Sequence, residues 1–154
     1  MCYKCIKVDK TNIKQAATIH SISWQESHRS FCSEDFVNLH TPERQRGYLK
    51  KKMDAGSEIY MLMDGEPVAI VSITGDLIED LYVIPDKQNN GYGTYLLQFA
   101  MDRCVGNPSL WILENNKGAE RLYRKLGFVE SGRVNSVDKG LDEIEFIHKT
   151  ELKQ

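Results

Sequence analysis

The spacing of apolar residues in the N-terminal third of the chain predicts one strand followed by three helices. Residues 3–8 alternate between polar and apolar side chains, which is typical of an edge strand. From Thr11, the expected N-cap, apolar residues recur at helical spacing to about residue 27. A second helix is expected after Ser33 as its cap, and a third over 42–54, with a proline in its first turn.

The middle of the chain is typical of a β-hairpin followed by a buried strand. Residues 57–63 and 67–73 are short apolar segments on either side of Asp64-Gly65, which is the strongest hairpin signal at short range. We therefore expect these two segments to pair antiparallel. Residues 77–84 are apolar on both faces, as expected of a central strand.

The remaining sequence completes a mixed α+β pattern. It predicts a helix from Gly91, a strand over 110–113, a helix capped by Asn115 or Asn116 and ending at Gly127, and two strands over 128–134 and 144–148. This order favours a central, mixed and mostly antiparallel sheet flanked by helices. Because 154 residues suit one such core and are few for two, residues 1–154 are interpreted as a single domain.

Composition and charge exclude several classes of partner. The chain has 20 basic and 22 acidic residues, so its net charge of −2 favours neither nucleic acid nor an anionic membrane. The run Lys50 to Lys52 is interpreted as a solvated helix face. No apolar stretch approaches the ~20 residues of a membrane span, and the charged first ten residues leave no room for a signal peptide. We expect a cytoplasmic protein that binds neither nucleic acid nor membrane.

The cysteines and histidines give no sign of a metal site. Cys2 and Cys5 form a C-x-x-C, but the second pair that a zinc site needs is missing, so they are expected to be reduced thiols, like Cys32 and Cys104. The chain has no H-E-x-x-H, and its histidines lack ligand-like spacing. We therefore expect no metal.

The clearest chemical signal is the junction between the 77–84 strand and the next helix, where Gly91 and Gly93 stand. A helix N-terminus leaves its first N–H groups without partners and carries roughly half a positive charge, so it can hold a phosphate. Glycine lets backbone and ligand approach closely. Leu96 stands where a dinucleotide fingerprint needs a third glycine, and no Walker-type sequence occurs, so other phosphate motifs do not fit.

Two segments carry a resemblance to a known family. Residues Gln88 to Gly93 read Q-x-x-G-x-G between an L-Y-V-x-P strand and an apolar helix, which resembles the coenzyme A pyrophosphate loop of the GNAT superfamily of acetyltransferases. Residues Asn116 to Phe128 are similar to the family's N-x-x-A-x-x-x-Y-x-x-x-G-F segment. The predicted order of elements also matches the GNAT fold over nearly the whole chain.

The resemblance implies that acetyl-CoA is the acyl donor. It implies that a backbone N–H of Val83 or Ile84 holds the thioester oxygen, that Asn116 contacts the pantetheine arm and that Tyr123 protonates the departing thiolate. The expected diphosphate-binding residues are Gln88, Asn89, Asn90, Gly91, Tyr92, Gly93 and Thr94. Tyr123 also lies on an apolar helical stripe, so a role in the core is the alternative for this residue.

An amine acceptor requires a base, because a group with a pKa near 10.4 has only about one molecule in a thousand unprotonated at pH 7. Glu79 is the leading candidate, since strand alternation places it on the same face as Leu81 and Val83. Asp80 is expected to point the other way and is the weaker candidate. The alternative for both is a strand-edge carboxylate in a salt bridge.

The predicted function is transfer of the acetyl group from acetyl-CoA to a primary amine, on a small molecule or a peptide, by direct attack in a ternary complex. Two alternatives stay open: a module of the same fold that binds or senses acyl-CoA without turnover, and an acetyltransferase for protein N-termini or lysines. Residues 23–29 resemble the helix end that borders the acceptor cleft in the family, with Trp24 expected in the core and Glu26 and His28 as candidates to meet a cation. Dimers are common in the family, which makes a homodimer a candidate assembly.

Overall fold

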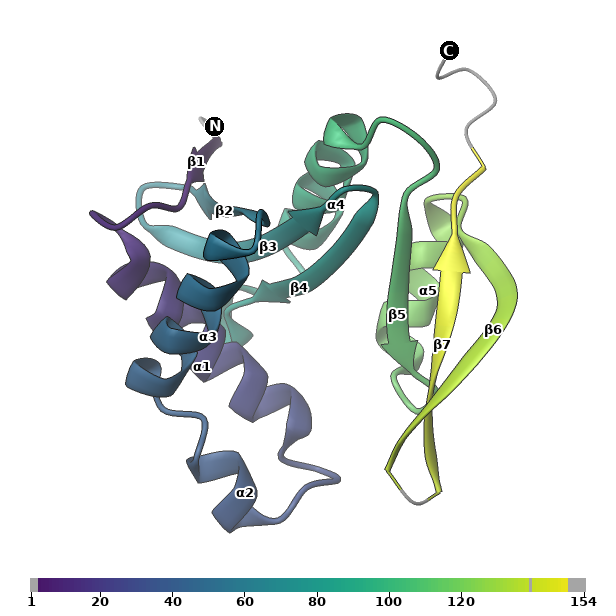
Figure 1. Cartoon of the computed structure of the whole chain (residues 1–154), viewed down its shortest axis with the longest axis horizontal. Helices are drawn as coiled ribbons and strands as arrows, with labels where there is room; N and C mark the ends of the chain where they lie inside the picture. The colour runs from purple at the N-terminus through teal and green to yellow at the C-terminus, as the bar shows by residue number, and fades with distance from the viewer. Residues whose placement is uncertain (1–2, 139, 150–154) are drawn as a thin grey trace.

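The computed structural model describes residues 3–138 and 140–149, and these form one mixed sheet covered by helices (Figure 1). The seven strands lie in the order β1-β2-β3-β4-β5-β7-β6. Their bounds are β1 (Lys4–Lys7), β2 (Glu58–Met63), β3 (Pro67–Thr74), β4 (Leu77–Val83), β5 (Ser109–Leu113), β6 (Val129–Asp138) and β7 (Leu141–Ile147). Every pair is antiparallel except β4 and β5, which confirms the predicted α+β class.

The helices lie on both faces of this sheet. They are α1 (Ile13–His28), α2 (Glu34–Asn38), α3 (Pro42–Asp54), the short 3₁₀ helix η1 (Pro85–Lys87), α4 (Tyr92–Arg103) and α5 (Lys117–Lys125). Among the described helices, none is both long and apolar enough to cross a membrane. Figure 1 shows α1 and α3 on one side of the β2–β4 strands and α4 on the other.

The helix starts follow the predicted caps with one exception. Ser33 Oγ accepts the N–H of Phe36 at 3.2 Å, and the hydroxyl of Thr41 accepts that of Arg44 at 3.2 Å, as expected of N-caps. The N-cap of α1, however, is Asn12 rather than Thr11. The prediction was wrong here because Thr11 donates its N–H and hydroxyl to Asp9 just before the helix, at 2.8 and 2.5 Å.

Two apolar clusters bury the two faces of the sheet. Along β2, Ile59 and Met61 face α1 and α3, while Tyr60 and Leu62 face the cluster that contains α4 and α5. This alternation within one strand is the period of two expected of a strand buried on both sides. The central strand β2 is therefore buried on both faces.

A gap in the sheet sets the position of the cleft. In the described part of the chain, β4 and β5 pair at only one position, Leu77 with Ser109, and then diverge. Figure 1 shows the two halves of the molecule separating along this line, with β1–β4 on one side and β5–β7 on the other. Backbone groups of β4 beyond Leu77 therefore face an opening instead of a neighbouring strand.

A β-bulge lies in β4 next to this opening. Ser72 of β3 pairs with Glu79 and Ile70 pairs with Tyr82, so two residues of β4, Asp80 and Leu81, stand opposite one residue of β3. Asp80 has φ 54°, a left-handed conformation that Asp adopts more readily than most residues. The bulge interrupts the strict alternation of side chains along the strand.

Candidate active site

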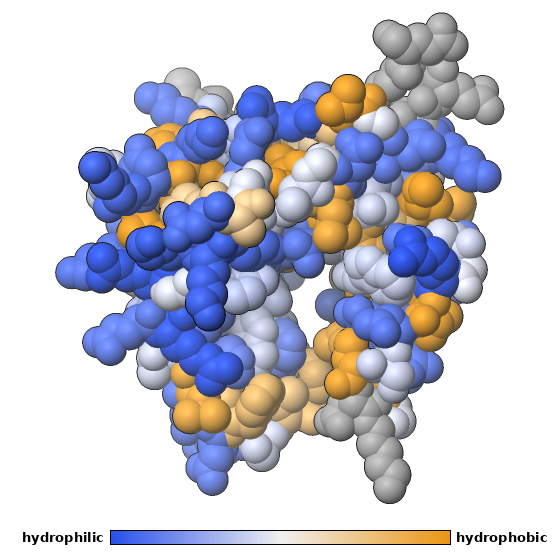
Figure 2. Space-filling view, in the orientation of Figure 1, coloured by the Kyte–Doolittle hydropathy of each residue, from blue (hydrophilic) through white to orange (hydrophobic). Residues whose placement is uncertain are grey.

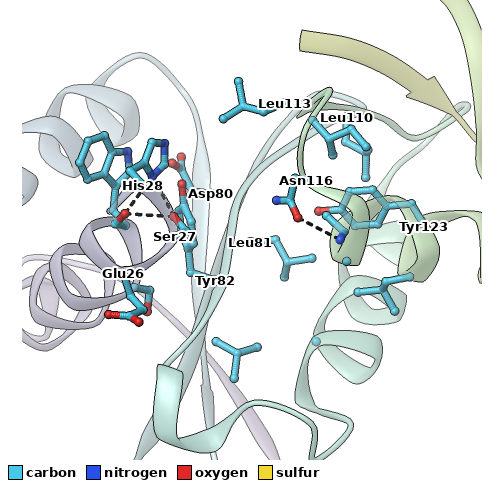
Figure 3. Close-up of a pocket in the computed structure, with 18 of the residues that line it drawn as sticks. Glu26, Ser27, His28, Asp80, Leu81, Tyr82, Leu110, Leu113, Asn116 and Tyr123 are labelled. Carbon is cyan, nitrogen blue, oxygen red and sulfur yellow. Dashed lines mark hydrogen bonds between the residues drawn. The ribbon is translucent and has the colours of Figure 1, made fainter. Parts of the chain in front are cut away.

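A cleft of about 1190 Å³ occupies the gap between β4 and β5. Figure 2 shows it as a deep opening between the two halves of the molecule. In Figure 3, Ser27, His28 and Tyr82 lie on one wall, and Leu113, Asn116 and Tyr123 lie on the opposite wall. The start of α4 forms one end of the cleft, so the predicted phosphate loop and the predicted acid border the same space.

The loop that enters α4 is shaped to receive an anion. Gly91, the N-cap of α4, has φ 84°, and a Cβ built on it would meet no described atom within 4 Å. None of the described side chains caps this helix, so its first N–H groups are open to a ligand. A phosphate placed there would gain hydrogen bonds and the field of the helix dipole.

Two side chains of the loop hold its shape. The amide of Gln88 donates to the carbonyl of Val83 at 3.2 Å, and that of Asn90 donates to the carbonyls of Lys87 and Gln88 at 3.0 and 3.2 Å. The lining of the cleft includes Gln88, Asn89, Gly91, Tyr92, Gly93 and Thr94, whereas Asn90 is not part of it. Asn90 therefore closes the turn, and the residues on either side of it line the cleft.

The two predicted donors for the thioester oxygen have different surroundings. The N–H of Ile84 donates to the carbonyl of Val68 in β3 at 3.0 Å, so it is already used within the sheet. Successive residues of a strand direct their N–H groups to opposite edges, which turns the N–H of Val83 toward the gap left by β5. Of the two N–H groups expected to bind the thioester oxygen, only that of Val83 is therefore still a candidate.

Tyr123 and Asn116 lie on the wall opposite β4 (Figure 3). Asn116 is the N-cap of α5, and its Oδ1 accepts the N–H of Ala119 at 3.1 Å. Tyr123 lines the cleft although it is only 8% exposed, and burial raises the pKa of its phenol to about 12. Because this pKa lies far above 7, the phenol of Tyr123 is protonated at pH 7.

Glu79 and Asp80 do not point in opposite directions, which corrects the expectation from strand alternation. The Lys52 ammonium lies 2.8 Å from Glu79 Oε1 and 2.9 Å from Asp80 Oδ2. The reason is the bulge, which turns Asp80 toward the side chain of its neighbour. Lys52 is also not on a solvated helix face, as its side chain is 13% exposed.

The two carboxylates have different environments. Asp80 is 9% exposed and binds His20 Nε2 at 2.9 Å and the hydroxyl of Tyr48 at 3.1 Å as well as Lys52. Burial alone would raise the pKa of Asp80, but His20 and Lys52 outweigh it and lower that pKa to about 2. Glu79 is 41% exposed, so of the pair it is the carboxylate that a ligand can reach.

The network behind Asp80 extends into α1 and α3. Gln45 Nε2 donates to His20 Nδ1 at 2.8 Å, which leaves the Nε2–H of His20 to donate to Asp80. His20 is 1% exposed, in keeping with a buried histidine whose hydrogen bonds are satisfied. The sequence offered no signal for Gln45, Tyr48 or Lys52, because their partners lie on another element more than 20 residues away.

The wall formed by α1 and α2, which lies opposite Tyr123 and Asn116 (Figure 3), is aromatic. The ring of Trp24 stacks between those of His28 and His40, with centroids 3.8 and 3.4 Å away. Trp24 was expected in the core, but its edge lines the cleft together with His28, Phe31 and Phe36. Glu26, at the rim, pairs with Arg29 at 3.6 Å.

The described residues contain no group of three or more histidine, cysteine or carboxylate side chains that could hold a metal ion. In the part of the chain that the structure covers, Cys5, Cys32 and Cys104 are outside any disulfide. Cys2, the other half of the C-x-x-C, lies outside the described residues.

Solved structures of acetyltransferases share this fold. The coenzyme A complex of PaiA N-acetyltransferase from Thermoplasma acidophilum superposes with a TM-score of 0.70 at 15% identity, over 97% of this chain and 100% of that one. The apo form of YjaB from Escherichia coli superposes with a TM-score of 0.74 at 18% identity, over 96% and 98% of the two chains.

Sequence comparison supports the same assignment. The peptidyl-lysine N-acetyltransferase YjaB of Salmonella typhimurium is 32% identical over 75 residues, which are 49% of this chain and 51% of that protein. The chain thus matches about half the length of this curated relative. The family model described as "Acetyltransferase (GNAT) family" matches residues 16–128, well over half of the sequence, and the chain therefore belongs to the GNAT acetyltransferase family.

Proposed function

We propose that this protein transfers the acetyl group of acetyl-CoA to a primary amine by direct attack in a ternary complex. The observation that carries the proposal is the single cleft that joins the uncapped start of α4 to both Tyr123 and Glu79. A donor held at one end of this cleft and an acceptor at the other can meet beside β4. No covalent acyl-enzyme is required.

The donor is assigned to the loop and to the wall formed by α5. The diphosphate of acetyl-CoA binds the backbone N–H groups of residues 88–94, and the pantetheine arm runs past Asn116. The N–H of Val83 donates a hydrogen bond to the thioester oxygen and stabilises the negative charge that develops on it. Removing such a donor typically costs about 3 kcal/mol of transition-state stabilisation.

The acceptor is assigned to the side of Glu79. This carboxylate takes the proton of the incoming ammonium, and the amine nitrogen then forms a bond to the acyl carbon as the carbon–sulfur bond breaks. Tyr123 donates its phenolic proton to the departing thiolate. Lys52 holds Glu79 on the cleft side of β4, since its ammonium lies 2.8 Å from Oε1.

The decisive experiment separates binding from turnover. Calorimetry with CoA and acetyl-CoA reports donor binding, and a thiol-release assay with a panel of amines reports transfer. The Glu79→Gln variant should bind CoA as the wild type does and lose 10²–10⁴-fold in acceptor-dependent release, the range typical of acid–base groups. CoA binding without acceptor-dependent release from the wild type would instead favour an acyl-CoA-binding module.

Acetylation of a protein lysine is the second candidate. It is favoured by one observation, the similarity to the peptidyl-lysine N-acetyltransferase YjaB of Salmonella typhimurium. A lysine peptide in the amine panel tests it directly, because a lysine acetyltransferase would use the peptide better than any small amine. A homodimer and a cytoplasmic location stay predictions.

A further inference from the structure

The wall of the cleft formed by the end of α1 and by α2 is a continuous group of aromatic rings. We call it the aromatic wall and define it as Trp24, His28, Phe31 and Phe36. Phe31 packs on His28 with ring centroids 5.2 Å apart, and Phe36 meets the edge of Trp24 at 5.9 Å. All four side chains line the same cleft as Glu79. The wall therefore offers ring faces and edges to whatever enters beside that carboxylate.

The two phenylalanines of the wall are incompletely buried. Phe31 is 36% exposed and Phe36 is 45% exposed, although each packs against the ring stack around Trp24. Single exposed apolar residues are common, but these two border the same cleft, so an apolar group that enters it beside α2 would cover them. Leu110, Leu113 and Leu141 line the opposite side together with polar residues such as Asn115 and Asn116, so the cleft is mixed and its aromatic surface is concentrated on the aromatic wall.

The charges on this side of the cleft favour one cation. Lys52 contributes one positive charge and Glu79 and Asp80 two negative charges, so this cluster carries a net charge of −1. A single ammonium balances it. Burial lowers the pKa of His28, so its ring is neutral at pH 7 and does not repel a cation. Arg29 is paired with Glu26 at 3.6 Å. An acceptor with a carboxylate would therefore find no open cation on the aromatic wall.

We propose that the acceptor is a primary monoamine with an aromatic ring on a short alkyl chain, whose ring packs on the aromatic wall while its ammonium meets Glu79. This inference rests on the acetyl transfer proposed above and names its substrate class. A polyamine brings two or more ammonium groups to a cluster with one unbalanced negative charge. A lysine within a peptide brings backbone amides whose desolvation against these rings is unfavourable. An arylalkylamine matches both the charge and the apolar surface.

A panel of four acceptors tests the assignment. We expect the wild-type kcat/KM for 2-phenylethylamine to exceed those for n-butylamine, spermidine and a lysine-containing peptide by about tenfold or more, the discrimination that an apolar pocket supplies. Equal or better use of any of the other three would overturn the substrate class and leave acetyl transfer intact. CoA binding without release from any of the four would overturn the acetyl transfer, and this inference with it.

The Phe36→Ala variant tests the wall itself. Because Phe36 is half exposed, its removal leaves the core intact, which thermal unfolding checks. It should lower kcat/KM for 2-phenylethylamine about tenfold and that for n-butylamine several-fold less, because the shorter alkyl group covers less of the ring, while the KM for acetyl-CoA stays unchanged. Leu39→Ala is the matched control, since Leu39 is an exposed apolar residue next to α2 that does not line the cleft. An equal loss for both amines in Phe36→Ala, or the same selective loss in Leu39→Ala, would contradict the proposal.

Discussion

Replacement of Asp80 by asparagine should remove a charge on which the fold depends, and the effect should depend on pH. Asparagine has the shape of a protonated aspartic acid, so Asp80→Asn reproduces the neutral state at every pH. The pKa of Asp80 is lowered from 3.8 to about 2. At about 1.4 kcal/mol per pKa unit, this shift corresponds to about 2 kcal/mol of stabilisation of the folded state by the ionised carboxylate.

The sign of the pH dependence follows from the direction of the shift. A carboxylate whose pKa is lower in the folded state binds fewer protons there than in the unfolded chain, so acid favours unfolding. The stabilisation is complete above about pH 4, the unfolded pKa, and is lost as the pH falls toward 2. Screening by solvent reduces it little, since the side chain of Asp80 is 9% exposed.

Urea unfolding of the wild type and of Asp80→Asn at pH 7, 4 and 3 measures this difference. At pH 7 the variant should be less stable by about 2 kcal/mol, which lowers the urea midpoint by about 1 M. The gap should narrow at pH 3. The control is Asp54→Asn, because Asp54 is 67% exposed and pairs with Lys50, so its loss should cost at most about 0.5 kcal/mol. A gap of the same size at pH 7 and pH 3 would refute the reasoning.

Three further predictions concern the donor side of the cleft. Tyr123→Phe should lower kcat by 10²–10⁴-fold without changing the KM for acetyl-CoA. Tyr95→Phe is the control, because Tyr95 does not line the cleft, and it should change neither value. A normal kcat in Tyr123→Phe would show that Tyr123 is only a core residue. Gly93→Val should raise the KM for acetyl-CoA, since the loop binds the donor before and during the reaction, and an unchanged KM would exclude diphosphate contact there. The hydroxyl of Tyr92 donates to Asp64 in the turn between β2 and β3, so Tyr92→Phe should weaken CoA binding several-fold in calorimetry; binding as tight as wild type would show that this contact does not position the loop.

The sequence alone determined the features that depend on neighbouring residues. The cap at Ser33, the span of α3 over residues 42–54 and the hairpin at Asp64-Gly65 were predicted correctly, and Asn116, one of the two caps considered, is the N-cap of α5. Capping and turn formation join groups a few residues apart, so the local sequence contains both partners. The start of α4 at Gly91 was also predicted from the sequence. The first N–H groups of any helix are unpaired wherever the helix lies in the fold, so this feature does not depend on distant contacts.

Only the tertiary structure decided which side chains meet in the cleft. Strand alternation predicted opposite directions for Glu79 and Asp80, but an extra residue of β4 against β3 turns both toward Lys52. A bulge is a property of two paired strands, so one strand's sequence does not specify it. The divergence of β4 from β5 and the packing of α2 against Trp24 likewise depend on contacts between distant segments. The motifs of this chain thus follow from short-range physics, while its cleft follows from long-range packing.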